Sequence, residues 1–201
     1  SGPEEFRELF TDSIGLRLRS DVPVGVCLSG GLDSTSIVST LVDGFGLANV
    51  NTFSAVYGWD RKGDESAFID LYKSKLTGMH FTWPDEQGLM ADLDDLTRIQ
   101  CEPIPSTSTY AQYRVMKLAK EHVTVTLDGQ GADEMLGGYH YFFGFFFKQL
   151  LRQGALGRLA REMKDYTALH RSTFGLKSLA FFLLPAALRS RARVAEKGFI
   201  H

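Results

Sequence analysis

Residues 24–35 read Val-Gly-Val-Cys-Leu-Ser-Gly-Gly-Leu-Asp-Ser-Thr, and this stretch decides the fold. Its apolar first half lacks the polar alternation of a solvated strand, which predicts a strand buried on both faces. Gly30 and Gly31 can take positive φ and turn N–H groups toward an anion. Ser34 and Thr35 follow at a predicted helix start, where hydroxyls cap free N–H groups and the helix dipole favours a phosphate. The stretch therefore predicts a strand, a phosphate-binding loop and a helix.

Asp33 lies beside this predicted phosphate site. A carboxylate next to phosphates would repel them, so we expect it to hold Mg²⁺, which takes oxygen ligands and is usually shared with substrate phosphates. A glycine pair that merely joins a strand to a helix is the alternative interpretation. The GxxxxGK[ST] loop of many other phosphate-binding proteins does not occur in the sequence.

Strand patterns alternate with helix patterns along the first two thirds of the chain. Besides the first strand, strands are predicted at residues 50–57, 79–83 and 123–127, and helices at residues 4–19, 34–42, 65–76, 86–99 and 110–121. This alternation predicts an α/β fold, a parallel sheet with helices on both faces, which binds ligands at the carboxyl ends of its strands. Residues 29–35 and 128–134 both follow such strand ends, so we expect the two loops to meet over one ligand.

Composition and charge exclude several classes of protein. The 201 residues carry a net charge of -2, and residues 101–201 carry an excess of basic residues. No aromatic-basic RNA module accompanies these basic residues, so we expect a solvated helical face rather than a nucleic-acid partner. Cys27 and Cys101 form neither a disulfide framework nor a CxxC pattern, which indicates a reducing compartment. No signal peptide or apolar span of 18 residues is present, so we expect a cytoplasmic protein without membrane contact.

A second motif follows the last predicted strand, where residues 128–138 read Asp-Gly-Gln-Gly-Ala-Asp-Glu-Met-Leu-Gly-Gly. Alone, it fits an acidic turn with Asp133 as a helix N-cap. Together with Ser-Gly-Gly-Leu-Asp-Ser it resembles the synthetase domain of glutamine-hydrolysing asparagine synthetases, in the PP-loop ATP pyrophosphatase superfamily, and their relatives the β-lactam synthetases and lasso-peptide cyclases. The likeness covers about residues 21–146 and includes residues 53–56, 64–66 and 102–103.

The resemblance implies an ATP-dependent ligase that activates a carboxylate, aspartate or another acid, as an acyl-adenylate. Pyrophosphate would leave, helped by Mg²⁺ and loop amides, and ammonia or an amine would take the acyl group. By resemblance, the ATP-binding residues are Leu28, Ser29, Gly30, Gly31, Leu32, Asp33, Ser34, Ala55, Asp128 and Gly129. Asp33 and Asp133 match the family's Mg²⁺ ligands, and the expected catalytic residues are Gln130, Asp33 and Ser34.

Gln130 departs from the family pattern, which has glutamate at this position, and Cys101 stands where the pattern has aspartate. A glutamine side chain forms hydrogen bonds but neither accepts a proton nor carries charge near pH 7. Three interpretations stay open. The chain belongs to an amide-forming ligase, to an ATP-binding family member with little adenylation activity, or to a PP-loop enzyme that modifies tRNA.

The resemblance also implies boundaries and partners. We expect an N-terminal helix at residues 1–20, a PP-loop ATP-binding synthetase core at residues 21–147 and a truncated helical segment at residues 148–201. The chain opens without methionine, so we expect a longer protein whose glutaminase domain is a partner, and no use of glutamine by this piece alone. A homodimer stays open. The aromatic run at residues 139–147 is predicted to be core, with interface as the alternative, and His140 to be a packed histidine.

Overall fold

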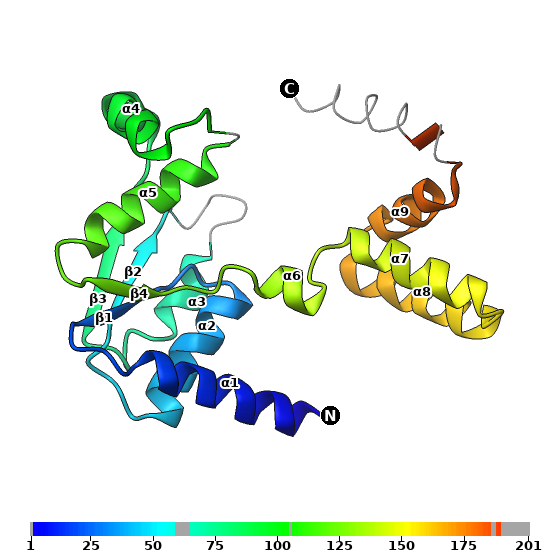
Figure 1. The fold of residues 1–201 in the computed structure, drawn as a ribbon, viewed down its shortest axis with the longest axis horizontal. Coiled ribbons are helices and arrows are strands. Elements are labelled where there is room, and N and C mark those ends of the chain that lie inside the picture. Colours follow the sequence, from blue (N-terminus) through cyan, green and yellow to red (C-terminus); the bar gives the residue numbers. More distant parts are fainter. Residues whose placement is uncertain (1, 59–64, 105, 186–187, 190–201) are drawn as a thin grey trace. The chain divides into compact units, whose positions relative to one another are not determined.

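The computed structural model describes residues 2–58, 65–104, 106–185 and 188–189, and the chain divides into two compact units, residues 1–130 and 131–201 (Figure 1). Residue 64, one of the residues that carry the resemblance, and residues 190–201 of the expected helical segment lie outside the described residues. In the part of the chain that is described, no helix combines the length and the apolar character needed to cross a membrane.

The first unit is built on a four-stranded parallel sheet with the strand order β3-β2-β1-β4. Its strands are β1 (Val24–Cys27), β2 (Asn51–Ala55), β3 (Gly78–Thr82) and β4 (Val125–Leu127). Val26 pairs with Thr52 of β2 on one side and with Leu127 of β4 on the other. The chain moves outward from β1 to β3 and then returns to the other side of β1. The topological switch point, where such sheets bind ligands, therefore lies between β1 and β4.

Helices cover both faces of this sheet, as predicted. The helices of this unit are α1 (Pro3–Arg17), α2 (Leu32–Ser39), the π-helical turn η1 (Thr40–Gly44), α3 (Ser66–Asp70), α4 (Glu86–Gln100) and α5 (Ser108–Ala119). The elements α1, α2, η1 and α3 pack against one face, and α5 packs against the other (Figure 1). Successive strand residues point to opposite faces, so Val26 and Leu28 join the first core while Cys27 joins the second with Phe53 and Val115.

Most predicted elements have different bounds in the structure, and three of the differences have a clear local cause. The helix predicted at residues 34–42 begins at Leu32, because Gly31 holds the N-cap position. The helix predicted at residues 65–76 is α-helical only over Ser66–Asp70 and continues as turns with i→i−3 hydrogen bonds, such as Lys73 N–H to Asp70 O at 3.1 Å. The strand predicted from residue 123 begins at Val125, since the Val123 N–H still bonds to the Ala119 carbonyl.

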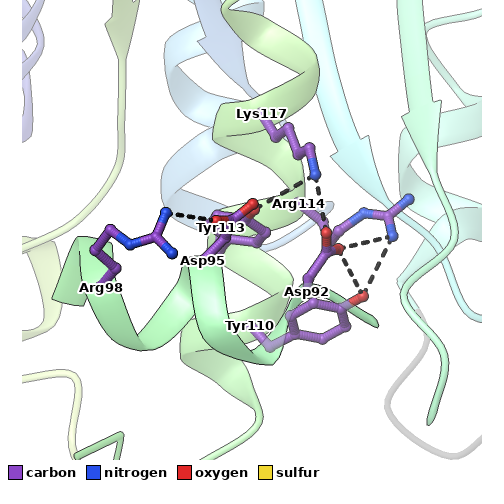
Figure 2. A network of polar contacts seen from close by, with 7 residues as sticks. All are labelled: Asp92, Asp95, Arg98, Tyr110, Tyr113, Arg114 and Lys117. Carbon is purple, nitrogen blue, oxygen red and sulfur yellow. Dashed lines mark hydrogen bonds and ion pairs between the residues drawn. The ribbon is translucent and has the colours of Figure 1, made fainter. Parts of the chain in front are cut away.

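A polar clasp joins α4 to α5 and so fixes the helix that covers the second face (Figure 2). The Asp92 carboxylate accepts hydrogen bonds from Lys117 Nζ at 2.8 Å, Arg114 Nη1 at 3.3 Å and the Tyr110 hydroxyl at 3.3 Å. A side chain at Gly88 would collide with the Tyr110 hydroxyl, so a glycine lets the two helices approach. The hydrogen bond with Lys117, followed by the charges of Lys117 and Arg114, lowers the pKa of Asp92. The clasp is therefore charged and stabilising at neutral pH.

The second unit is helical, with α6 (Ala132–Leu136), α7 (Tyr141–Arg152), α8 (Leu156–His170) and α9 (Phe174–Leu183). Its core contains Phe147, Leu150, Leu159, Tyr166 and Leu179. A Cβ on Gly144 would lie 2.6 Å from the Ser178 Cβ, so α7 and α9 pack with their backbones in close approach.

The aromatic run at residues 139–147 is core on one side only. Phe147 is fully buried and Phe143 packs against the same core, whereas Tyr141 and Phe145 are exposed. His140 is exposed, so the prediction of a packed histidine is wrong, although its ring contacts Tyr166 and His170 edge-on. Its Nδ1 lies 3.1 Å from the Tyr166 hydroxyl, which also accepts the Gly175 N–H at 3.0 Å.

Candidate nucleotide-binding site

Two adjoining pockets open at the carboxyl ends of the central strands. The first, which we call the apolar pocket, has about 210 Å³ and is lined by Cys27, Leu28, Ser29, Phe53, Ala55, Tyr57, Glu65, Gln112 and Val115. The second, which we call the polar pocket, has about 160 Å³ and is lined by Cys27, Ser29, Gly31, Asp33, Ser34, Gln112, Asp128, Gly129 and Gln130. Both pockets border β1, and the polar pocket lies at the switch point between β1 and β4.

The serine hydroxyls fasten the loop after β1 to the start of α2. The Ser34 Oγ accepts the Ser29 N–H at 3.2 Å and donates to the Gly31 carbonyl at 3.2 Å, and the Ser29 Oγ lies 3.0 Å from it. The Thr35 hydroxyl donates to the Gly31 carbonyl at 2.8 Å. The prediction that Ser34 and Thr35 cap free N–H groups is therefore wrong. Because the helix begins two residues earlier than predicted, both hydroxyls donate to carbonyl groups, and the N–H that the Ser34 Oγ accepts belongs to the loop and not to the first turn of the helix.

The first turn of α2 presents free N–H groups at this loop. Within the described residues, the backbone N–H groups of Leu32, Asp33 and Ser34 have no hydrogen-bond acceptor, as expected for the first turn of a helix without a side-chain cap. Gly30 has the predicted positive φ, 93°, and a Cβ there would lie 2.6 Å from the Glu65 carbonyl oxygen. Gly31 has an ordinary φ of -66°, so the same expectation is wrong for it. The free N–H groups form a site that suits an anion.

The loop after β4 meets the loop after β1, as the sequence predicts. A Cβ on Gly129 would lie 3.0 Å from the Asp33 Cβ and 3.2 Å from the Ser34 nitrogen. Asp128 uses both carboxylate oxygens, since Oδ2 accepts from Gln112 Nε2 at 3.2 Å and Oδ1 accepts the Gln130 N–H at 3.3 Å. The two loops thus form one surface that contains Asp33, Ser34 and the predicted Gln130.

The Cys27 thiol lies where the two pockets join. Burial raises its pKa to about 12, and the negative charge of Asp128 and a hydrogen bond to it add to the rise. Because the thiolate is the nucleophilic form, Cys27 is an inert neutral thiol near pH 7. It lines both pockets and borders Gln112 and Asp128.

The residues predicted to bind Mg²⁺ belong to different units. Asp33 lines the polar pocket, whereas Asp133 lies on α6 of the second unit, packed against Gly138. Among the described residues, no group of three or more His, Cys, Asp or Glu side chains could hold a metal ion. A Mg²⁺ ion that arrives with substrate phosphates needs only one or two protein carboxylates. Asp33, beside the free N–H groups, fits that requirement, and the role of Asp133 stays a prediction.

Gln112 and Glu65 also contribute to the pockets, although the motifs do not include Gln112. Glu65 packs against Gly30 and lines the apolar pocket. A signal for Gln112 exists in the sequence. Val115 and Ala119 follow it at positions i+3 and i+7 of α5, on the face that packs against the sheet. A polar residue on that apolar stripe points to a site at the sheet's edge.

A parallel sheet with a glycine-rich loop after its first strand, at the switch point, defines an α/β protein of the PP-loop type. A sequence model of the family described as Asparagine synthase matches residues 5–195. The chain therefore belongs to the asparagine synthase family, and the resemblance read from the two motifs is confirmed.

Named relatives agree with this family. The chain is 33% identical over 190 residues to a protein named putative asparagine synthetase [glutamine-hydrolyzing] 2 of Methanocaldococcus jannaschii, covering 92% of this chain and 35% of that protein. It is 34% identical over 143 residues to asparagine synthetase [glutamine-hydrolyzing] 1 of Bacillus subtilis, covering 69% and 22%. With amidase chry2 of Gibberella zeae, identity is 29% over 153 residues, covering 69% and 23%. The chain thus spans about a third or less of the length of these relatives.

Proposed function

We propose that this chain is the ATP-binding part of an amide-forming ligase. Such a ligase activates a carboxylate as an acyl-adenylate, releases pyrophosphate, and transfers the acyl group to ammonia or an amine. The observation that carries the proposal is the contact between the loops after β1 and β4, which joins Gly129 to Asp33 and Ser34. Membership of the asparagine synthase family supports the reaction class.

ATP fits the chemistry of the two pockets. Ala55, which lies beside the fully buried Leu28 and Phe53, offers an apolar surface to a purine ring, and the free N–H groups of the first turn of α2 offer donors to its phosphates. Bound Mg²⁺ would neutralise charge on the pyrophosphate as it leaves. Asp33 would hold the ion, and the Ser29 and Ser34 hydroxyls would keep the loop closed around the phosphates.

The side chain of Gln130 limits which steps of the ligase reaction the residues of this chain can catalyse. An amide holds a substrate group by hydrogen bonds and takes no proton near pH 7, so proton transfer from the amine would need another base. We therefore propose a carboxylate other than aspartate as the acyl substrate. Ammonia would come from a glutaminase domain of a longer, cytoplasmic protein.

A second candidate function is ATP binding with little adenylation, and Gln130 is the observation that favours it. ATP–pyrophosphate exchange with a panel of carboxylic acids separates the two functions. Exchange with at least one acid supports the ligase. ATP binding without exchange, for every acid in a protein that includes the flanking domains, supports the binding module.

Calorimetry with Mg-ATP tests the nucleotide site directly. Asp33→Asn should weaken Mg²⁺-dependent ATP binding by about tenfold, because one oxygen ligand with a full charge is lost. Asp94→Asn, the same change at an exposed position of α4, is the control and should bind as the unaltered chain does. Equal affinities for the Asp33→Asn variant and the unaltered chain would contradict the role of Asp33.

A further inference from the structure

Gln112 is the polar side chain that α5 contributes to both pockets. Its neighbours on the sheet-facing side of α5, Val115 and Ala119, are buried in the core with Cys27 and Phe53. The clasp of Asp92 with Tyr110, Arg114 and Lys117 occupies another side of α5 and fixes the helix from there (Figure 2). Gln112 therefore projects from a firmly held helix toward the place where the pockets join.

Asp128 is the partner of Gln112 in the polar pocket. Its Oδ2 accepts the Gln112 Nε2–H at 3.2 Å, and its Oδ1 accepts the Gln130 N–H at 3.3 Å. A carboxylate that accepts from both sides can hold a short loop in one conformation, as in an Asx turn. The side chain of Asp128 thus links α5 to the loop of residues 128–130.

The position of that loop bears directly on the anion site of α2. Gly129 packs on Asp33 and Ser34, where a Cβ would already be within 3.0 Å and 3.2 Å of their atoms. A shift of the loop by a few tenths of an ångström toward α2 would press on Asp33 and cover the Ser34 N–H. Gln112 can influence the site through Asp128 without touching a ligand.

We propose that Gln112 is a positioning residue that holds Asp128 and thereby sets the loop of residues 128–130 against the start of α2. For its ligand, Mg-ATP, the proposal rests on the proposed function. The carboxamide matters because it can donate to Asp128, whereas a carboxylate cannot. Among the described residues that line the two pockets, the charged side chains are Asp33, Glu65 and Asp128, with no Lys or Arg. A further carboxylate at position 112 would therefore face uncompensated negative charge.

An exchange of amide and carboxylate tests the proposal. Gln112→Glu places two carboxylates at hydrogen-bond distance and should weaken Mg-ATP binding in calorimetry by about tenfold. Adding Asp128→Asn restores a donor and an acceptor, now in the opposite direction. The double variant should bind Mg-ATP within about twofold of Asp128→Asn alone. Gln87→Glu, the same change at an exposed position of α4, is the control and should leave binding unchanged.

Unaltered affinity in Gln112→Glu, or a double variant that binds Mg-ATP about tenfold more weakly than Asp128→Asn alone, would overturn the proposal. A Gln112→Glu variant that lowers the unfolding temperature but keeps its ATP affinity would also overturn it, since the role would be structural only. If Gln112→Glu does not fold, Gln112→Met keeps the length without the donor and should weaken binding severalfold. Equal affinity of the folded Gln112→Met variant would overturn the proposal.

Failure of the proposed function is recognisable separately, because the unaltered chain would then bind no Mg-ATP. In that case the two single variants and the double variant are compared by their unfolding temperatures. A decrease of the unfolding temperature in Gln112→Glu that Asp128→Asn reverses supports the positioning contact. Decreases that simply add up in the double variant overturn it.

Discussion

Gly129 lies directly against Asp33, although 96 residues separate them in the chain: a β-carbon at Gly129 would come within 3.0 Å of the Asp33 Cβ. This close approach exists because β4 returns to the side of β1 opposite β2. The loops that follow the two strands then share one edge of the sheet. A glycine is needed where one backbone packs on another in this way.

We expect Gly129→Ala to weaken Mg-ATP binding by about tenfold, because the methyl group pushes on Asp33 and partly covers the Ser34 N–H. Calorimetry at saturating Mg²⁺ measures the change. Gly157→Ala on α8 is the matched control, since a Cβ there meets no atom within 4 Å. If both variants bind Mg-ATP equally well, the packing of Gly129 does not control the site.

The meeting of these loops could be predicted from the sequence because each lies after an apolar, β-branched strand. The alternation of strands and helices predicts a parallel sheet, and parallel strands place their carboxyl ends at one edge. The strand order could not be read locally, since every buried strand has the same apolar pattern. The order β3-β2-β1-β4 is what turns two loops into one surface.

Side-chain roles within the loops were harder to predict. Ser34 has the residue type of a helix cap, but the helix starts at Leu32, so the Ser34 hydroxyl caps no N–H of the first turn; it donates to the Gly31 carbonyl and accepts the Ser29 N–H of the loop. Gln112 belongs to no motif, and its position on the apolar stripe of α5 identifies its partners only when that helix is placed on the sheet. Element boundaries and the contacts of single polar side chains depend on tertiary packing, which periodicity does not encode.

Asp92 supplies a prediction about stability and pH. Asp92→Ala should cost about 2 kcal/mol of unfolding free energy at pH 7, because it removes the carboxylate that accepts from both Arg114 and the Tyr110 hydroxyl and leaves only the hydrogen bond between these two. The folded pKa of Asp92 is lowered, so its contribution is fully present above the unfolded pKa, about 3.9, and is lost as pH falls through the folded pKa. Denaturant unfolding at a series of pH values measures the difference between the two proteins, which should shrink toward acid.

The control for Asp92 lies one turn away on the same helix. Asp95 pairs with Arg98 at 3.0 Å on the exposed face of α4 (Figure 2). Asp95→Ala should change the unfolding free energy by less than about 0.5 kcal/mol, since exposed pairs are screened by water and salt. Equal losses for the two variants would mean that the clasp is no stronger than a surface ion pair.

Thr52 is a position where a single substitution should stabilise the folded protein. Its side chain is fully buried in β2, and in the described part of the chain its Oγ1 has no hydrogen-bond partner. Thr52→Val keeps the shape and removes the unpaired hydroxyl, so unfolding free energy should rise by about 1 kcal/mol. Denaturant titration measures the gain.

Ser54, on the same strand and also buried, gives the opposite case, because its hydroxyl donates to the Leu28 carbonyl at 2.6 Å. Ser54→Ala should lower the unfolding free energy by about 1–2 kcal/mol. Should Thr52→Val destabilise the protein as much as Ser54→Ala does, the Thr52 hydroxyl has a partner such as a bound water.

Gln130 gives the prediction that bears most directly on the substrate. Its backbone N–H is held by Asp128, and its side chain lines the polar pocket beside Asp33. If the protein were an aspartate-activating enzyme that lost a general base, Gln130→Glu would raise aspartate-dependent pyrophosphate release by roughly 10²–10⁴-fold. We expect instead no gain with aspartate, because the pocket already holds the carboxylates of Asp33 and Asp128 and an amide suits another acid.

Pyrophosphate exchange, measured with aspartate and with a panel of other acids in a protein that includes the flanking domains, decides between these outcomes. The expected result is exchange with an acid other than aspartate in the natural protein, and weaker exchange with that same acid in Gln130→Glu. A glutamate at position 130 would add a third negative charge near Asp33 and Asp128, which raises the cost of bringing a carboxylate substrate to ATP. Recovery of aspartate activity on this single change would show that Gln130 marks the loss of a base and not a different specificity.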